Sequence, residues 1–295
     1  MNKEMAYLIG MIIGNGQIAD NGVSTKVVID IPHKMLTTEK GHNIQVYAMA
    51  STVPIRNIIE PMLGCTVNVV DERNNTKLVF SKSSSDYCIT EINKYVNYGS
   101  RHHTMDMSSN VFYLPYSEKV AFMRGIADVT GYIRYSNICF GQKNQHRVYI
   151  EIPYNWNTVI DIANLLKTMD IPVQNIDFAH PNMRDPKRIK YDEGQPNFWK
   201  KEHQIKIFAN EFLPIGFNVI QKQEMLEDCA HKLLTDSAFA GKNPMPTHKF
   251  YWEKRRAPKA KEYHPGENDP SLPARIRGKH YECWQDIAND LGYKK

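Results

Sequence analysis

An apolar helical pattern occurs twice along the chain. Residues 7–18 read Tyr-Leu-Ile-Gly-Met-Ile-Ile-Gly-Asn-Gly-Gln-Ile, and residues 122–133 read Phe-Met-Arg-Gly-Ile-Ala-Asp-Val-Thr-Gly-Tyr-Ile. The copies align without a gap and pair Gly10 with Gly125. Self-similarity of this kind indicates a repeated structural unit. Each copy predicts a helix with apolar residues on one side that ends at a glycine.

The glycines inside the two copies predict how the helices meet. Gly10 and Gly14 in the first helix and Gly125 in the second have no side chain to hold a neighbouring backbone away. We therefore expect the helices to pack against one another almost backbone to backbone. The plainer interpretation is a pair of glycine-containing apolar helices that pack and do nothing else.

The residues after each repeated helix predict the same series of elements. After the first helix, β-branched and alternating runs predict strands, and apolar residues at helical spacing predict a helix that Gly64 stops. A last helix follows, capped by Ser84 or Ser85. The expected ranges are strands 24–31 and 42–48, a helix over 54–63, strands 66–70 and 76–80, and a helix to about residue 98.

The second repeated helix, with Ser117 as its expected cap, begins the same order again. The expected ranges are strands 133–140 and 147–152, a helix over 156–169, strands 173–178 and 203–208, and a helix over 214–234. The predicted domains are a first unit at 1–98, a linker at 99–116, a second unit at 117–236, and a basic linker with a small helical element at 237–295.

The repeated helix and the doubled order of elements resemble the LAGLIDADG homing-endonuclease family over about the first 235 residues. The resemblance implies an α+β fold of two pseudo-symmetric αββαββα units plus a small C-terminal accessory segment. It implies that the two signature helices form the interface between the halves. It also implies a monomer whose two sheets form a saddle over the major groove of double-stranded DNA, its partner.

The position that carries the family's metal-binding acid is not acidic in either copy. In the family, an acid just before the last motif glycine binds the divalent metal that drives DNA cleavage. The matching residues here are Asn15 and Thr130. Uncharged side chains remove most of the affinity for a hard cation. The sequence therefore predicts a degraded nuclease centre, with no cofactor needed for binding and with Mg²⁺ needed if the chain is a nuclease.

Other residues offer remnants of such a centre. Asp128 lies two positions before Thr130, about 200° round a helix of 3.6 residues per turn, so its side chain is expected to point elsewhere unless the helix end unwinds. Gln142 and Lys143, at the exit of a second-unit strand, match the accessory residues that the family places near its metals. Asp20, just after the first motif, is a further candidate carboxylate.

The expected strands alternate, so one face packs on helices and the other offers polar side chains to base edges. These types include those that read guanine, adenine and cytosine. Taken singly, each is a solvent-facing residue as readily as a base reader. The candidates are Lys26, Asp30, Gln45, Lys77, Arg134, Ser136, Arg147, Glu151, Asn175, Asp177, Gln204 and Lys206, with Lys254, Arg255 and Arg256 as a phosphate clamp.

The charge is concentrated in the last residues. The chain of 295 residues has a net charge of +5, and residues 241–295 hold 12 Lys and Arg against 7 Asp and Glu, while the first 240 residues hold 25 of each sign. A basic excess favours a nucleic-acid partner, and here it belongs to the tail. Residues 181–201 form a charged insertion that either follows a phosphate backbone or is a solvated loop.

The remaining features limit the class of protein. No apolar run approaches the roughly 20 residues that a membrane span needs, so we expect no membrane partner. The 5 cysteines are odd in number and include no C-x-x-C pair, which indicates reduced thiols in a cytosolic protein. We expect a cytoplasmic, nucleoid-associated location. His264, His280 and Cys283 make at most half a zinc site. Residues 283–292 suggest part of a helix-turn-helix.

Together these observations favour sequence-specific binding of double-stranded DNA by a fold whose nuclease centre is degraded. The first alternative is an active site-specific endonuclease, of homing or restriction type, with a rearranged metal site. The second is an intron maturase that binds RNA, since family members without cleavage include both regulators and maturases. The third is a protein-interaction module.

Overall fold

The computed structural model describes residues 1–36, 44–97, 104–134, 146–153, 155–177 and 202–235. The fold is α+β. Two compact units divide the chain: Met1–Ile150 with Phe208–Ser237, and Glu151–Ile207 with Ala238–Lys295. The domain boundaries expected near residues 98 and 117 stay a prediction. Among the helices described, none is both long and apolar enough to cross a membrane.

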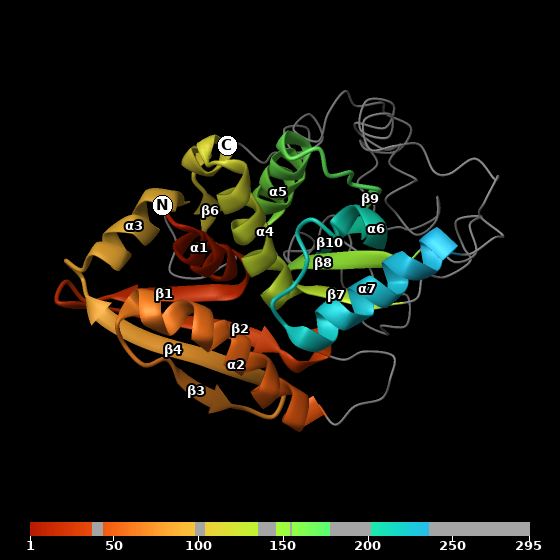
Figure 1. Cartoon of the computed structure of the whole chain (residues 1–295). Helices are drawn as coiled ribbons and strands as arrows, with labels where there is room; N and C mark the ends of the chain where they lie inside the picture. The colour runs from red at the N-terminus through yellow and green to blue at the C-terminus, as the bar shows by residue number, and fades with distance from the viewer. Residues whose placement is uncertain (37–43, 98–103, 135–145, 154, 178–201, 236–295) are drawn as a thin grey trace, which may run out of the picture. The chain divides into compact units, whose positions relative to one another are not determined.

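The first repeat folds entirely within unit 1 (Figure 1). Its order is αββαββα, as the sequence predicts. The elements are α1 (Lys3–Asn15), β1 (Gly16–Asp20), β2 (Ser24–Pro32), α2 (Ile44–Leu63), β3 (Asn68–Asp71), β4 (Asn75–Ser83) and α3 (Tyr87–Tyr95), with a short 3-10 helix η1 (His33–Met35) before α2.

The second repeat has the same order along the chain, except that two helices follow its last strand, and it is shared between the units. Unit 1 holds α4 (Tyr116–Thr130), β7 (Gly131–Arg134), the start of β8 (Arg147–Pro153), α6 (Ala209–Phe212) and α7 (Ile220–Thr235). Unit 2 holds the end of β8, α5 (Trp156–Thr168), β9 (Asn175–Asp177) and β10 (Glu202–Phe208) up to residue 207. Within unit 1, β7 pairs antiparallel with β8, and within unit 2, β10 pairs antiparallel with β9.

Helix α1 is buried along its length. Asn2 caps its first turn by accepting a hydrogen bond from the Met5 N–H at 2.9 Å, and every residue from Met5 to Asn15 is buried. The cap at the other end, Gly16, has φ −108°, which is extended backbone. A Cβ there would lie 2.6 Å from the Ile12 Cα, so space rather than a positive φ requires glycine.

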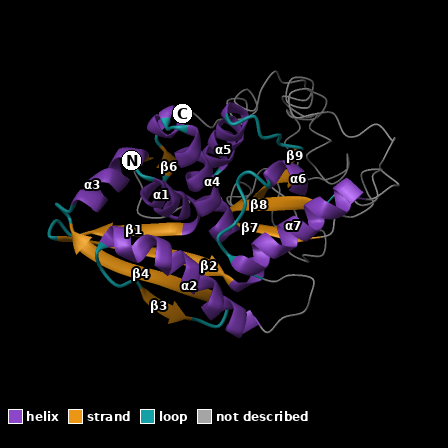
Figure 2. Cartoon of the chain, viewed as in Figure 1, coloured by secondary structure: helices purple, strands orange, loops and turns teal. Residues whose placement is uncertain are grey.

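The first sheet has the strand order β1-β2-β4-β3 and is antiparallel throughout. Side chains of β2 alternate, with Val27, Ile29 and Ile31 buried and the residues between them partly or fully exposed. Helices cover the buried face, and α2 lies across β4 there (Figure 2). On the other face of this sheet, most of the described side chains are partly or fully exposed.

The expectation of a strand over residues 42–48 is wrong. Residues from Ile44 onward belong to α2, which continues to Leu63 with Pro54 inside it. Proline is common at the first position of a helix, so the sequence indicated a start at Pro54 that the structure does not have. The partner of β2 is instead β1, which follows directly from α1.

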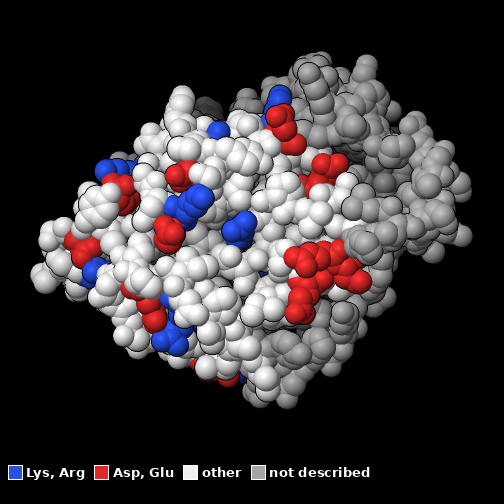
Figure 3. All heavy atoms as spheres, viewed as in Figure 1, with Lys and Arg blue, Asp and Glu red and all other residues white. Residues whose placement is uncertain are grey.

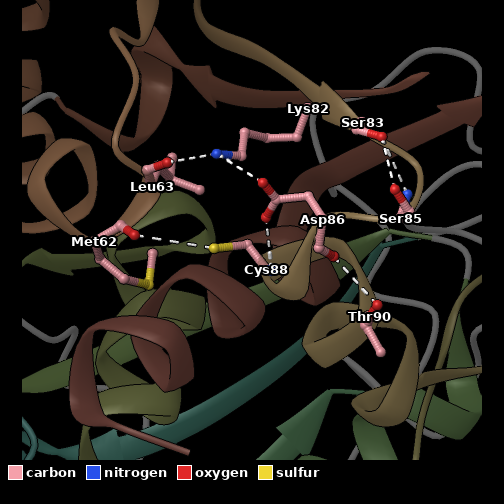
Figure 4. A network of polar contacts seen from close by, with 8 residues as sticks. All are labelled: Met62, Leu63, Lys82, Ser83, Ser85, Asp86, Cys88 and Thr90. Carbon is pink, nitrogen blue, oxygen red and sulfur yellow. Dashed lines mark hydrogen bonds and ion pairs between the residues drawn. The ribbon is translucent and has the colours of Figure 1, made fainter. Parts of the chain in front are cut away.

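The start of α3 depends on a polar network (Figure 4). Asp86, rather than Ser84 or Ser85, caps the helix by accepting from the Cys88 N–H at 2.8 Å. Lys82 links this cap to α2, since its Nζ lies 2.9 Å from Asp86 Oδ2 and 2.8 Å from the carbonyl of Leu63. The hydrogen bond to Asp86 raises the pKa of Lys82, and the same bond lowers the pKa of Asp86.

The expected linker contains structure. Strands β5 (Val96–Asn97) and β6 (Asp106–Met107) pair antiparallel, and a 3-10 helix η2 (Ser109–Tyr113) precedes α4. Pro115 occupies the cap position of α4, and the Ser117 hydroxyl donates to Glu118 Oε2, so Ser117 is not the cap. The described part of the expected linker, from residue 104 onward, therefore contains regular elements where the sequence indicated only polar character.

Candidate nucleic-acid interface

The two repeated helices pack against each other through their glycines (Figure 1). A Cβ added at Gly10 would lie 2.0 Å from the Phe122 carbonyl oxygen, and one at Gly125 would lie 2.1 Å from that of Tyr7. A Cβ at Gly14 would lie 3.2 Å from Thr130 Cγ2. The backbones are thus in direct contact, and the C-terminal ends of α1 and α4 are brought together.

Asn15 and Thr130, which the motif resemblance matches to metal-binding acids, both form hydrogen bonds within the protein. Asn15 Nδ2 donates to the backbone oxygen of Asp30 at 2.8 Å, and Thr130 Oγ1 donates to that of Ile126 at 2.7 Å. Both residues are buried. A hard divalent cation prefers anionic oxygen ligands, and this pair of neutral side chains at two negative helix ends does not fit one. Within the described ranges no three His, Cys, Asp or Glu residues gather as a metal site.

Asp128 is a structural residue. It is fully buried, accepts from the Tyr7 hydroxyl at 2.7 Å, and accepts from the backbone N–H groups of Asn218 and Val219 at 3.1 and 3.3 Å. Helix α4 continues to Thr130, so the unwound end that would turn this carboxylate toward a metal is not present. Burial raises the pKa of Asp128, although Lys222 and these hydrogen bonds oppose the rise.

Lys222 compensates the buried carboxylate. Its Nζ donates to the carbonyl of Asp128 at 2.6 Å and lies 5.6 Å from the ring centroid of Phe217. A cation here also suits the negative end of α4. Burial lowers the pKa of Lys222 to about 8, and Asp128 limits that fall. Lys222 was not among the predicted site residues. Its helical spacing from Met225, Leu226 and Cys229, which are buried, is the signal in the sequence that indicates a buried charge.

The outward face of the first sheet begins where α1 ends. The strand register places Gln17 opposite Val28 and Asp30 opposite Lys77, so these side chains share that face. Lys26 is exposed on the same face. The expected base-contacting positions Lys26, Asp30 and Lys77 are therefore brought together, and Gln17 joins them. Gln17 was not among the predicted contacts, although period-2 alternation after the motif glycine would have identified it.

Asp30 on β2 contacts the end of α1 through its backbone, because its carbonyl oxygen accepts from Asn15 Nδ2. Its Oδ2 accepts from Gln17 Nε2 at 3.2 Å, while its Oδ1 is buried and has no hydrogen-bond partner among the described residues. Burial raises the pKa of Asp30, and Lys77 opposes the rise. Lys77 itself donates to Glu72 Oε1 at 2.5 Å.

The predicted contacts on the second repeat lie differently. Arg147, Gln204 and Lys206 are buried, so the expectation that they face solvent is wrong. In unit 1 the Arg147 guanidinium lies 5.7 Å from the ring centroid of Phe208, which takes it away from a base edge. In unit 2 Gln204 Nε2 donates to Glu151 Oε1 at 2.9 Å, which engages both polar groups.

Several expected residues have other placements. Gln45 belongs to α2 rather than to a strand. Asp20 accepts from Ser84 Oγ at 2.6 Å at the end of β1 remote from α1, so it does not approach the helix ends. The side chains of Gln45, Arg134, Asn175 and Asp177 lie outside what is described, as do Ser136, Gln142, Lys143, Lys254, Arg255, Arg256, His264, His280, Cys283 and the insertion at 181–201.

Acidic side chains gather on the face shown in Figure 3. They lie over α7, where Glu224 and Glu227 are exposed and Asp228 is half-buried. A phosphate backbone is repelled by such a group. The open face of the first sheet, with Lys26 and Lys77, suits nucleic acid better.

Comparisons with known proteins find likeness only at the level of structure. No family model and no curated protein matches the chain. Among solved structures, mesophilic variants of the homing endonuclease I-DmoI are 14% identical, with 75% of this chain and 95% of that chain covered and a TM-score of 0.39. The I-LtrWI LAGLIDADG homing endonuclease bound to target DNA is 11% identical, with 83% of this chain and 98% of that chain covered and a TM-score of 0.41. The N-terminal LAGLIDADG domain of DUF199/WhiA is 12% identical, with 76% of this chain and 82% of that chain covered and a TM-score of 0.39.

Proposed function

We propose that this protein binds specific sites in double-stranded DNA and does so without a divalent metal. The observation that supports this most is the arrangement of unit 1: two helices meet at their glycines, and directly from the end of the first helix an open sheet face presents Gln17, Lys26 and Lys77. Polar side chains on a sheet face can reach base edges in the major groove.

The helix ends explain why binding is separated from cleavage. Asn15 and Thr130 are neutral and donate to backbone oxygens. The Asp128 carboxylate is held by Tyr7 and by backbone N–H groups. Under this proposal the chain keeps the scaffold that the motif resemblance implies, and among the described residues these two helix ends aim no pair of anions at a scissile phosphate.

The net charge supports contact with phosphates through the tail. Residues 241–295 carry the net +5 of the chain, and the first 240 residues are neutral. Phosphate contacts give affinity, and base contacts give specificity. In this proposal the basic tail supplies much of the first and the sheet face supplies the second.

The test is selection of duplexes from a randomised library by the full chain in EDTA. We expect one enriched sequence, an equal Kd in EDTA and in Mg²⁺ by fluorescence anisotropy, and weaker binding as salt rises. No cut or nicked strand should appear with Mg²⁺ or Mn²⁺. Failure to enrich any duplex, or displacement of the duplex by an RNA of equal length, would overturn the proposal.

An active endonuclease is the second candidate, and one observation favours it. Asp30 lies beside Asn15, with one carboxylate oxygen unpartnered among the described residues. A carboxylate so placed is a possible ligand for a displaced metal. Under this candidate, Mg²⁺ or Mn²⁺ produces a nick in the selected duplex, and Asp30→Asn abolishes the nick while binding persists.

A further inference from the structure

One hydrogen bond fixes which way the Gln17 amide is turned. Gln17 Nε2 lies 3.2 Å from Asp30 Oδ2, across from β1 to β2 on the outward face of the first sheet. An ionised carboxylate has acceptors only, so it must face the NH₂ end of an amide and not its oxygen. Asp30 therefore selects one of the two orientations of this side chain.

The groups of the Gln17 amide that Asp30 does not engage form a defined pattern of one hydrogen-bond donor and one acceptor. An amide has two N–H donors and one carbonyl oxygen, and Asp30 engages one donor. One donor and one acceptor remain side by side. Adenine presents the complementary pair in the major groove, the N7 acceptor and the N6 amino donor, and glutamine matches them in a bidentate pair.

Asp30 is placed to orient Gln17 rather than to read a base itself. Its Oδ1 is buried and its Oδ2 is engaged by Gln17. The backbone carbonyl of the same residue accepts from Asn15 Nδ2, and this bond ties the strand to the end of α1. Asn15 at the end of α1 and Gln17 on β1 thus both donate hydrogen bonds to Asp30. These two bonds hold Asp30 in place as a support for the Gln17 amide.

We propose that Gln17, turned by Asp30, reads one adenine in the bound duplex. The inference rests on the proposed function, because it names the base that the same sheet face recognises. In this arrangement Gln17 is the specificity residue and Asp30 is a positioning residue. The ionised Asp30 carboxylate has acceptors only, so the reversed amide, which would present its oxygen to the carboxylate, is disfavoured.

The test begins with the duplex selected by the full chain and with the complete set of duplexes that each differ from it at one base pair. Gln17→Ala should remove the preference for adenine at one position, a loss of about 5- to 150-fold in discrimination there, which is the range of one bidentate pair. Preferences at all other positions should stay within about twofold of the unchanged protein, because additive readout confines the effect to one base pair.

Asp30→Asn separates positioning from reading. Asparagine keeps the size of the side chain but can accept or donate, so it permits both orientations of Gln17. We expect the adenine preference at that same position to weaken toward acceptance of a second base, with Kd for the best duplex changed by less than about fivefold. Glu224→Gln, the same change of a carboxylate to an amide at an exposed position on α7, is the matched control and should change neither quantity.

The outcomes keep the two claims apart. If the unchanged protein enriches no duplex, the proposed function fails. If it enriches a duplex and Gln17→Ala retains every base preference, the function stands and this inference is overturned. Loss of preference with Gln17→Ala but not with Asp30→Asn would overturn the role given to Asp30. Circular dichroism of each variant verifies that it is folded, so that lost binding is not read as lost specificity.

Discussion

Two aspartates near the ends of the repeated helices have opposite surroundings. Asp128 on α4 is fully buried and holds hydrogen bonds from Tyr7 and from two backbone N–H groups. Asp30 on β2 is half-buried on the outward sheet face and has one oxygen without a partner among the described residues. Residue type and proximity to a motif therefore do not decide the role of a carboxylate, and its partners do.

The difference also predicts how strongly a substitution of each aspartate affects the stability of the fold. A buried carboxylate with a full set of partners and a nearby ammonium is part of the scaffold, since removing one member leaves a buried charge behind. A half-exposed carboxylate that orients a neighbour contributes little to folding, and its loss should appear in recognition. The following predictions test this separation, beginning with the largest effect.

The packed side is tested most severely at Gly10. Gly10→Ala places a Cβ 2.0 Å from a backbone oxygen that cannot move aside. We expect a loss of at least about 4 kcal/mol in the free energy of unfolding, measured by urea denaturation, because the helices must separate. Gly22→Ala is the control, since Gly22 has φ +83° and open space around it, and should cost about 1 kcal/mol. Equal losses would mean that α1 and α4 are not in close contact.

Removal of the Asp128 carboxylate is the next largest effect. Asp128→Ala leaves the buried Lys222 ammonium without its partner, and we expect a loss of about 3–5 kcal/mol in the free energy of unfolding. Replacing both residues with apolar ones, Asp128→Leu with Lys222→Met, should recover much of that loss. A stable Asp128→Ala protein that had lost a nicking activity would place the carboxylate in a nuclease centre instead.

The pH dependence of stability tests the same pair. Lys222 has a folded pKa of about 8 against its ordinary 10.5, so between these values the unfolded chain binds the extra proton. The contribution of Lys222 to the free energy of unfolding therefore rises with pH between the two pKa values, on the order of 1 kcal/mol per pH unit. Urea denaturation from pH 7.5 to 10.5 should show the rise relative to Lys222→Met. A parallel course in both proteins would show that Lys222 is not buried.

The smallest effect is expected on the open side. Burial raises the pKa of Asp30, so the ionised carboxylate is less favourable in the folded chain than in the unfolded chain. The free energy of unfolding of Asp30→Asn should therefore lie within about 1 kcal/mol of that of the unchanged protein, on the more stable side. Thermal denaturation at pH 7 measures this. A large destabilisation by Asp30→Asn would assign Asp30 to the scaffold and remove the contrast with Asp128.

The sequence predicts the order of elements because the repeat and its glycines carry strong local signals. Gly10 and Gly125 have no conformational requirement for glycine, and their contact with a carbonyl oxygen explains both. The second strand of the first unit was misplaced because Pro54 resembles a helix start, whereas the helix continues upstream. Local pattern was insufficient there, since pairing of β2 with β1 is decided by tertiary contact.

The site was harder to predict than the fold. The neutral pair Asn15 and Thr130 can be read from the motif, but their hydrogen bonds to backbone oxygens cannot. Lys222 acts on α4 from about 90 residues away in sequence, where its contact with the Asp128 carbonyl was not foreseeable. The register that puts Gln17 beside Asp30 likewise follows from strand pairing and not from composition.

We propose that the paired ends of α1 and α4 present uncharged groups and bind no divalent metal. The most direct measurement is Mn²⁺ binding followed by electron paramagnetic resonance, with the full chain on its selected duplex and the duplex alone as reference. We predict no saturable Mn²⁺ beyond that of the duplex, and a new bound ion when Asn15→Asp and Thr130→Asp are combined. A stoichiometric Mn²⁺ on the unchanged protein that is lost with Asn15→Ala would contradict the account.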